Sequence, residues 1–302
     1  MAEGVTCLVV AMKIAVLGTG RMGTALAERL LGAGHEVVVW NRSPERAKQA
    51  VAAGARAAGS VEEAVEGAGA VLTSLSDDVA VRQVALGEGG LRATLGDGAP
   101  YLESSTVSPK LTAELAGIFA HFAAVPVVGG PAAVSAGEAT YLVGTTDATF
   151  EKIAPLLQSL GERQRRYASA PVASAAKLAV NFLLLSGAVC LAESFAVGRA
   201  GGLSDEQLRD LLGAAVAPGL RNRFEALLGS PEQGWWTTAL GAKDASLAVD
   251  LAESGGTELQ VAPAVRDAFL RAARQGYAGE DIAAVRHMYE PARQAALRPP
   301  LA

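Results

Sequence analysis

The sequence predicts an α/β fold, a doubly wound parallel sheet, followed by an all-α C-terminal domain that opens with a long interdomain helix. The chain has 302 residues, enough for two domains at roughly 100–200 residues each. Its first half alternates short β-branched runs with segments of helical period, and strand patterns largely disappear from its second half. We therefore expect an N-terminal extension over 1–12, an α/β domain over 13–171 and a helical domain over 172–302.

Composition and charge exclude several classes of protein. Half of the residues are hydrophobic and 34 are glycine, which indicates a globular enzyme rather than a disordered chain. A net charge of −5 disfavours nucleic acid as a partner. Cys7 and Cys190 lie in separate apolar stretches, so we expect buried thiols in a reducing cytoplasm and no metal site. The longest apolar run, 178–192, is shorter than the ~20 residues of a membrane span, and no basic residue precedes the apolar patch of a secretory signal, so we expect no membrane partner.

The first βαβ unit contains a glycine-rich turn. A strand pattern over 13–17 passes through Gly18, Gly20 and Gly23 into a helical pattern, and a second strand pattern follows at 36–40. In this context the spacing G-x-G-x-x-G predicts a Rossmann domain with a dinucleotide pyrophosphate at the helix N-terminus. The predicted contacts to the dinucleotide are Gly18, Thr19, Gly20, Arg21, Met22 and Gly23.

The residues after the second strand predict which dinucleotide binds. NAD enzymes place a carboxylate there for the ribose 2′-hydroxyl, whereas this chain has Asn41, Arg42 and Ser43, followed by Arg46. Arginine and hydroxyl donors suit a 2′-phosphate, so the predicted cofactor is NADP, bound in part by these four residues. The alternative is that Arg42 lies on a solvated loop and that Ser43 only caps the helix beginning at Pro44.

Further strands and helices alternate along the domain. Strand patterns cover 70–75, 99–103 and 123–128, and helical patterns include 79–86 and 109–120. Ligands of such sheets bind beyond the carboxyl ends of the strands. This adds four residues to the predicted cofactor site, namely Leu75, Ser76, Ser105 and Thr106, whereas Ser108 is expected only to begin a helix.

The second half is predicted to be helical. A periodic apolar pattern over 172–199 indicates a helix of roughly 40 Å, long enough to bridge domains or a dimer interface. Ser204 and Gln207 have the spacing of a capping box. Further helices are expected over 204–215, 219–228, 238–252, 262–275 and 280–296.

Two polar residues stand near the start of the long apolar helix. Lys177 and Asn181 are four residues apart and share one helix face. After Lys152 the only lysines are Lys177 and Lys243, and a partly buried lysine can exchange a proton as a general acid/base requires. The alternative is a lysine whose amine reaches solvent and an asparagine satisfied within the core.

Taken together, these motifs resemble the β-hydroxyacid dehydrogenases, the family that includes 3-hydroxyisobutyrate dehydrogenase and the glyoxylate/succinic semialdehyde reductases. The similarity covers the chain from about Lys13 to its C-terminal region. The motifs that carry it are Gly18-Thr-Gly-Arg-Met-Gly23, Gly34-His35, Asn41-Arg42-Ser43, Ser105-Thr-Val-Ser-Pro109, Gly129-Gly130, Lys177-x-x-x-Asn181 and Lys243-Asp244.

The resemblance implies a role for several residues. Ser105 or Thr106 would contact the nicotinamide and Lys243 the cofactor. Lys177 would be the catalytic acid/base and Asn181 would bind substrate, a small hydroxyacid or semialdehyde. The resemblance also implies an active site between the domains and a homodimer or tetramer formed through the helical domain.

The substrate loop departs from the family pattern. Val128 stands where the family usually has a serine before Gly129-Gly130, whose backbone N–H groups are expected to receive a substrate carboxylate. The following residues, through Val134, are similar to those of imine reductases and reductive aminases, so C=N reduction is the alternative reaction. The 6-phosphogluconate dehydrogenases fit less well because Val180 replaces their histidine. A non-catalytic NADP-binding protein is a further alternative.

Three aromatic or titratable features carry no assigned role. Trp235-Trp236 lines the substrate cleft or packs the helical domain, and we favour packing. His121 and His287 belong to no motif.

Overall fold

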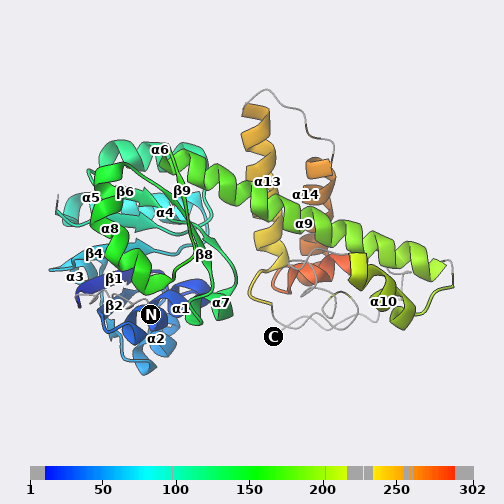
Figure 1. The fold of residues 1–302 in the computed structure, drawn as a ribbon, viewed down its shortest axis with the longest axis horizontal. Helices are drawn as coiled ribbons and strands as arrows, with labels where there is room; N and C mark the ends of the chain where they lie inside the picture. The colour runs from blue at the N-terminus through cyan, green and yellow to red at the C-terminus, as the bar shows by residue number, and fades with distance from the viewer. Residues whose placement is uncertain are drawn as a thin grey trace, which may run out of the picture. The chain divides into compact units, whose positions relative to one another are not determined.

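The computed structural model describes residues 11–96, 98–200, 202–215, 227, 234–254, 259 and 261–289. The chain divides into two compact units, Met1–Leu178 and Ala179–Ala302. The first is an α/β unit and the described part of the second is helical, which confirms the predicted fold class (Figure 1). Of the expected extension over 1–12, residues 1–10, which include Cys7, lie outside the described residues.

The first unit alternates strands and helices up to the start of α9. Its strands are β1 (Lys13–Leu17), β2 (Glu36–Trp40), β3 (Arg56–Ala57), β4 (Ala70–Thr73), β5 (Tyr101–Glu103), β6 (Phe122–Ala124), β7 (Val127–Val128), β8 (Thr140–Gly144) and β9 (Gln164–Tyr167). Its helices are α1 (Arg21–Gly32), the 3₁₀ helix η1 (Pro44–Ala47), α2 (Lys48–Ala52), α3 (Val61–Val65), α4 (Asp78–Leu86), α5 (Leu91–Thr94), α6 (Pro109–Ile118), α7 (Pro131–Ser135) and α8 (Asp147–Leu160).

The strands form one sheet in the order β3-β2-β1-β4-β5-β6-β8-β7, with β9 paired to β8. The first six strands in this order are parallel, and the chain order reverses between β1 and β4. Ile14 and Val16 of β1 belong to one buried cluster, and Ala15 and Leu17 belong to a second. Because successive strand residues face opposite sides, both faces of the sheet are covered, which explains the continuous apolar strands.

The sequence predicted only part of the sheet beyond β5. The single strand expected over 123–128 is two short strands, β6 and β7, and both pair with β8 in antiparallel fashion. The strands β8 and β9 were missed. Strand β9 reads Gln-Arg-Arg-Tyr, with both arginines exposed, because it lies at the outside of the sheet where charge discourages further strand pairing.

The second unit is built on α9. The structure gives α9 (Ala170–Ala200), α10 (Asp205–Ala215), α13 (Thr238–Ser254), α14 (Val261–Ala272), the short π-helical segment η2 (Ala273–Tyr277) and the 3₁₀ helix η3 (Ile282–Tyr289). The helix expected over 280–296 is thus wrong in type over its described part. The one expected over 219–228 lies outside the described residues except Leu227.

Local sequence signals explain the ends of several helices. The Ser204 hydroxyl accepts from the Gln207 N–H at 3.2 Å and the Gln207 side chain accepts from the Ser204 N–H at 2.8 Å, which confirms the capping box. Likewise Ser108 caps α6 by accepting from the Leu111 N–H at 3.2 Å. The short side chains of these residues therefore determine where both helices begin.

The long helix α9 differs from expectation in two respects. Its segment Ala170–Ala192 is long and apolar enough to cross a membrane by length and composition alone, a test that core helices of soluble proteins also pass. The estimate from 178–192 was too short because the small residues before Leu178 extend the apolar segment. Cys190 is exposed, so the prediction that it is a buried thiol is wrong. An apolar helix still has an outer face, and Cys190 lies on it with Leu183.

Candidate active site

Four loops that carry predicted cofactor residues meet at one edge of the sheet. They follow the carboxyl ends of β1, β2, β4 and β5, which are neighbours in the order β2-β1-β4-β5. The reversal of chain order between β1 and β4 makes this edge the position where doubly wound sheets bind nucleotides. The sheet therefore brings the predicted loops after Leu17, Trp40, Thr73 and Glu103 together.

The three glycines of the first loop have different surroundings. Gly18 has a φ of +99°, and a Cβ there would lie 2.3 Å from the Ser74 carbonyl oxygen. A Cβ on Gly23 would lie 1.9 Å from the Gly18 carbonyl oxygen, whereas a Cβ on Gly20 would meet no atom within 4 Å. Gly18 and Gly23 are thus required by the protein itself, and Gly20 leaves open space in front of the loop.

The start of α1 leaves polar groups for a ligand. Gly20 occupies the N-cap position of α1 without a side-chain cap, and no acidic residue lies in the first turn. Within the described residues the buried Thr19 Oγ1 has no hydrogen-bond partner. A helix N-terminus, open space at Gly20 and the unpaired Thr19 hydroxyl fit a dinucleotide pyrophosphate.

Asn41 connects the glycine loop to the loop after β2. Its Oδ1 accepts from the Thr19 N–H at 3.1 Å and its Nδ2 donates to the Ser43 carbonyl oxygen at 3.0 Å. Both ends of the amide therefore contact the protein, and Asn41 shapes the predicted cofactor site.

The residues predicted to select NADP lie on this second loop and on η1, which follows it. Arg42 and Arg46 are exposed, and Ser43 stands at the N-cap of η1 without a side-chain capping bond. The alternative in which the Ser43 hydroxyl caps the helix is therefore wrong. The loop and η1 together present two guanidinium groups and a hydroxyl that does not cap the helix.

Ser105 joins the loops after β4 and β5. Its Oγ accepts from the Leu75 N–H at 2.8 Å, and its own N–H donates to Glu103 Oε1 at 2.7 Å. Ser105 is buried and Thr106 is half-buried. Ser76 is exposed and donates to Asp77, which caps α4 through the Ala80 N–H. Ser105 thus holds the two loops together, and Thr106 is the more accessible of the pair predicted to contact the nicotinamide.

Behind Ser105 lies a buried carboxylate that sequence reasoning missed. Glu103 is 0% exposed, and its Oε2 accepts from the Thr73 and Tyr101 hydroxyls, each at 2.7 Å. Burial raises the pKa of Glu103, and burial together with the Glu103 charge raises the pKa of Tyr101. A charged residue at the end of an apolar strand, followed by two serines, was the available signal.

The predicted substrate loop follows β7. Gly129 has a φ of +135°, and a Cβ there would lie 3.2 Å from the Ala133 side chain. Gly130 occupies the N-cap of the short helix α7, and Val128 is half-buried. A side chain at Gly129 is disfavoured by its φ, so this loop is built from bare backbone next to Val128.

The polar residues of the helical part are carried by α9 and α13. Lys177 and Asn181 lie one helical turn apart on α9. Asn181 is 4% exposed and its Nδ2 donates to Asp244 Oδ2 on α13 at 2.7 Å. Lys243 Nζ lies 2.7 Å from Asp244 Oδ1. The structure thus joins Asn181 and Lys243 through Asp244, for which sequence reasoning assigned no role.

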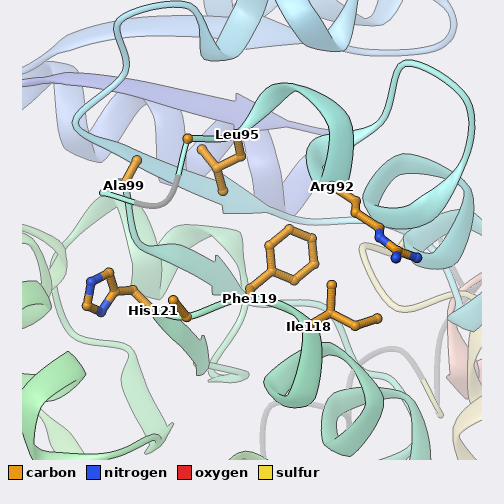
Figure 2. A pocket seen from close by; sticks show the side chains of 8 residues that line it. Arg92, Leu95, Ala99, Ile118, Phe119 and His121 are labelled. Atoms are coloured by element: carbon orange, nitrogen blue, oxygen red, sulfur yellow. The ribbon is translucent and has the colours of Figure 1, made fainter.

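Two further features are a pair of tryptophans in the helical part and a hollow in the α/β unit. Trp236 is buried in the helical core, as the packing interpretation predicted, and stacks on Trp235, which is 39% exposed. Figure 2 shows a hollow lined by Leu95, Phe119 and His121. It lies where β5 and β6 begin, at the opposite end of the strands from the predicted cofactor loops.

Comparison with known proteins agrees with these features. Residues 13–170 match the family described as the NAD-binding domain of 6-phosphogluconate dehydrogenase. Residues 172–289 match the NAD-binding family of NADP-dependent 3-hydroxyisobutyrate dehydrogenase. The fold and the glycine loop define a nicotinamide-dinucleotide oxidoreductase. The chain belongs to the β-hydroxyacid dehydrogenase family, as its motifs predicted.

Individual relatives cover nearly the whole chain. An uncharacterized oxidoreductase, YfjR of Bacillus subtilis, is 32% identical over 91% of this chain and 98% of its own. The NAD-dependent L-serine dehydrogenase of Pseudomonas aeruginosa is 29% identical over 92% and 98%. The structure of Mycobacterium tuberculosis 3-hydroxyisobutyrate dehydrogenase with L-serine superposes with a TM-score of 0.79 at 26% identity, over 93% of this chain and 100% of that one. An imine reductase from Myxococcus stipitatus shares the fold, with a TM-score of 0.62 at 22% identity over 92% and 100%.

Proposed function

We propose that this protein is an NADP(H)-dependent oxidoreductase that transfers hydride between the nicotinamide and a small hydroxyacid or semialdehyde, with Lys177 as general acid/base. The observation that most supports the proposal is the polar set on α9 and α13: Lys177 lies one turn before Asn181 on the apolar helix α9, and Asn181 is linked through Asp244 to Lys243. A core helix needs none of these groups for packing, and a hydride-transfer site needs a proton donor and polar contacts to its substrate.

The proposed preference for NADP rests on this chain's own residues. A relative is named as NAD-dependent, so family membership does not carry the choice. Arg42 and Arg46 are exposed beside the glycine loop, and no carboxylate stands between Trp40 and Ser43. Charge-assisted hydrogen bonds from guanidinium groups favour a cofactor that carries a 2′-phosphate over one that carries a hydroxyl.

The residues divide the chemistry between them. When bound, the nicotinamide supplies a hydride to a carbonyl carbon or accepts one from an alcohol carbon. In reduction, Lys177 donates a proton from Nζ to the oxygen of the reacting carbon, and the C=O group becomes CH–OH. In oxidation, neutral Lys177 removes that proton again. Asn181 orients the substrate, and the backbone N–H groups around Gly129 and Gly130 bind its carboxylate.

A substrate panel tests the proposal. Oxidation of NADPH is followed with small semialdehydes, glyoxylate, cyclic imines and ketone–amine mixtures. We expect turnover with a semialdehyde or glyoxylate, and we expect Lys177→Ala to abolish it while NADPH affinity survives. Lys152→Ala, which removes an exposed lysine on α8, is the matched control. Undiminished turnover by Lys177→Ala contradicts the assignment of the acid/base.

The same panel examines the alternatives. Val128 in place of the usual serine removes one hydroxyl contact to a carboxylate, and the residues from Gly130 to Val134 resemble those of imine reductases, which supports reduction of C=N as the alternative. Turnover confined to cyclic imines or ketone–amine mixtures would establish that alternative. NADPH binding with no turnover on any member would favour a non-catalytic binding protein.

We also propose that the protein acts as a homodimer or tetramer formed through its helical domain. The outer face of α9 carries Ala179, Leu183 and Cys190, all exposed, and Leu183 is 66% exposed. An apolar face of this kind on a long helix is the sort of surface that a second copy of the chain covers.

A further inference from the structure

Asp244 is a buried carboxylate that holds two predicted site residues at once. It lies on α13, is 4% exposed, and contacts Asn181 through Oδ2 and Lys243 through Oδ1, each at 2.7 Å. Asn181 comes from α9, 63 residues earlier in the chain, so the contact links the two helices. Figure 1 shows α13 crossing α9 in this unit.

The contact fixes the orientation of the Asn181 amide. An ionised carboxylate only accepts hydrogen bonds, so the amide must turn its NH₂ group towards Asp244. Within the described part of the chain, Asn181 Oδ1 accepts no hydrogen bond. The carboxylate thus fixes one of the two amide orientations, in which Oδ1 and the second N–H hydrogen are presented to a ligand. Without a carboxylate at position 244, the amide can rotate by 180°, so that Oδ1 and the NH₂ group exchange places.

The Asp244 carboxylate lies among buried apolar residues, where a charged group is less favourable than an apolar one if its only role is packing. Its chain neighbours Ala242 and Ala245 are buried in one apolar cluster with Leu185 of α9. A buried charge has a desolvation penalty that apolar residues of similar volume avoid, so an ion pair in a core is weak evidence for a stabilising role. Moreover, Oδ1 has the Lys243 ammonium at ion-pair distance without the geometry of a hydrogen bond.

We infer that Asp244 is a positioning residue: it holds the Asn181 amide in the orientation that contacts substrate and restrains the Lys243 ammonium beside it. The inference rests on the proposed function, in which Asn181 contacts substrate and Lys243 the cofactor. One carboxylate thereby sets the geometry of a substrate contact and the charge available to the cofactor.

The first test is Asp244→Asn in the full-length enzyme. The new amide can still accept from Asn181 through Oδ1, so we expect an unchanged thermal midpoint. It no longer dictates the amide orientation, so we expect kcat for the substrate found by the panel to fall about tenfold or more. Lys243 loses its anionic partner, so NADPH binding, measured by cofactor fluorescence, is expected to stay equal or become tighter. Ser246→Ala, which removes a bond made only within α13, is the matched control.

The second test is the double variant Asn181→Asp with Asp244→Asn, in which the amide and the carboxylate change places. The hydrogen bond forms again in the reverse direction, so we expect the exchange to restore any thermal stability that Asn181→Asp loses, but not the turnover. Recovery of turnover together with stability would overturn the inference, because the pair would then be structural only. So would an Asp244→Asn enzyme with unchanged kcat, or one that binds NADPH more weakly.

Failure of the inference and failure of the proposed function are distinguishable. Absence of NADPH-dependent turnover in the unsubstituted enzyme argues against the proposed function. The NADPH affinity of Asp244→Asn needs no substrate and still tests whether Asp244 restrains Lys243.

Discussion

The carboxylate of Glu103 accepts a hydrogen bond from the backbone N–H of Ser105 at 2.7 Å, and Ser105 in turn accepts from the Leu75 N–H at 2.8 Å. Two loops at the cofactor edge thus depend on one fully buried acid. The same carboxylate accepts from the Thr73 and Tyr101 hydroxyls, so its bonds reach from the core of the sheet to the predicted nicotinamide loop. Such a network fixes the loops more firmly than surface contacts do.

Glu103 predicts a pH dependence of stability. Burial raises its pKa in the folded protein, so the folded state binds the proton more tightly than the unfolded chain does. The stability that this protonation contributes is fully present below the unfolded pKa of about 4.3 and is lost as pH rises through the higher folded value. We expect the unfolding free energy of the native protein, relative to Glu103→Gln, to be greater at pH 5 than at pH 7.5 in urea titrations. The same difference at both pH values would contradict the assignment.

The glycine loop predicts opposite outcomes for two similar substitutions. In Gly20→Ala the new methyl group meets no atom within 4 Å, so the thermal midpoint is expected to stay unchanged. The methyl group then obstructs the pyrophosphate, and NADPH affinity is expected to fall by about 1–3 kcal/mol. In Gly23→Ala the methyl group lies 1.9 Å from the Gly18 carbonyl oxygen, so the protein itself is expected to be destabilised. Calorimetry and NADPH titration separate the two effects, and normal NADPH affinity in Gly20→Ala contradicts the proposed site.

The loop after β2 predicts the cofactor preference. We expect a strong preference for NADPH over NADH, and we expect Arg42→Ala to weaken it. The variant loses a hydrogen bond to the charged 2′-phosphate, and such a bond typically contributes about 1.5–3 kcal/mol of binding free energy. Steady-state kinetics with both cofactors measure the ratio of their kcat/KM values. Arg92→Ala removes an exposed arginine from the hollow at the opposite end of the strands and serves as the control. Equal kinetics with NADH in the native enzyme overturn the prediction.

Local patterns were sufficient to predict the first half of the sheet. Strands β1 and β2 are short runs of buried β-branched and aliphatic residues, and Gly18, Gly20 and Gly23 mark the turn between β1 and α1. Both signals come from neighbouring residues, which is why periodicity and spacing identify them. The same holds for the capping residues Ser108 and Ser204.

Contacts between distant residues were not predictable in this way. Asn181 and Asp244 are 63 positions apart, and the polarity of each alone does not name the other. Strand β9 was missed because exposed arginines conceal its pairing with β8. The exposure of Cys190 depends on which face of α9 the neighbouring helices cover, and an almost uniformly apolar helix does not reveal that face.

His35 predicts a pH dependence of the opposite sign. It is 4% exposed, its Nδ1 accepts from the Met12 N–H at 3.3 Å, and its Nε2 lies 2.8 Å from the Ser159 hydroxyl. That hydroxyl donates to the Pro155 carbonyl oxygen, so Nε2 carries the hydrogen and the ring is neutral. Burial lowers the pKa of His35. Stability is therefore expected to fall as pH drops below the unfolded pKa of about 6.5, and His35→Gln should reduce this fall. Urea titrations from pH 7.5 to 5.5 measure the fall in the free energy of unfolding. An identical pH profile in His35→Gln would refute the prediction.

Leu183 predicts the oligomeric state. Its side chain is 66% exposed on α9, with Ala179 one turn earlier, and burial of a leucine against a partner contributes about 1.5–3 kcal/mol. We expect the native protein to elute as a dimer or larger in size-exclusion chromatography with light scattering. Leu183→Glu places a charge on this face and is expected to shift the protein towards monomer at micromolar concentration, since an unpaired buried carboxylate is costly. Val51→Glu makes the same change at a 43% exposed valine on α2 and is expected to leave the assembly intact. A monomeric native protein, or equal dissociation by both variants, would show that this face of α9 is not the interface.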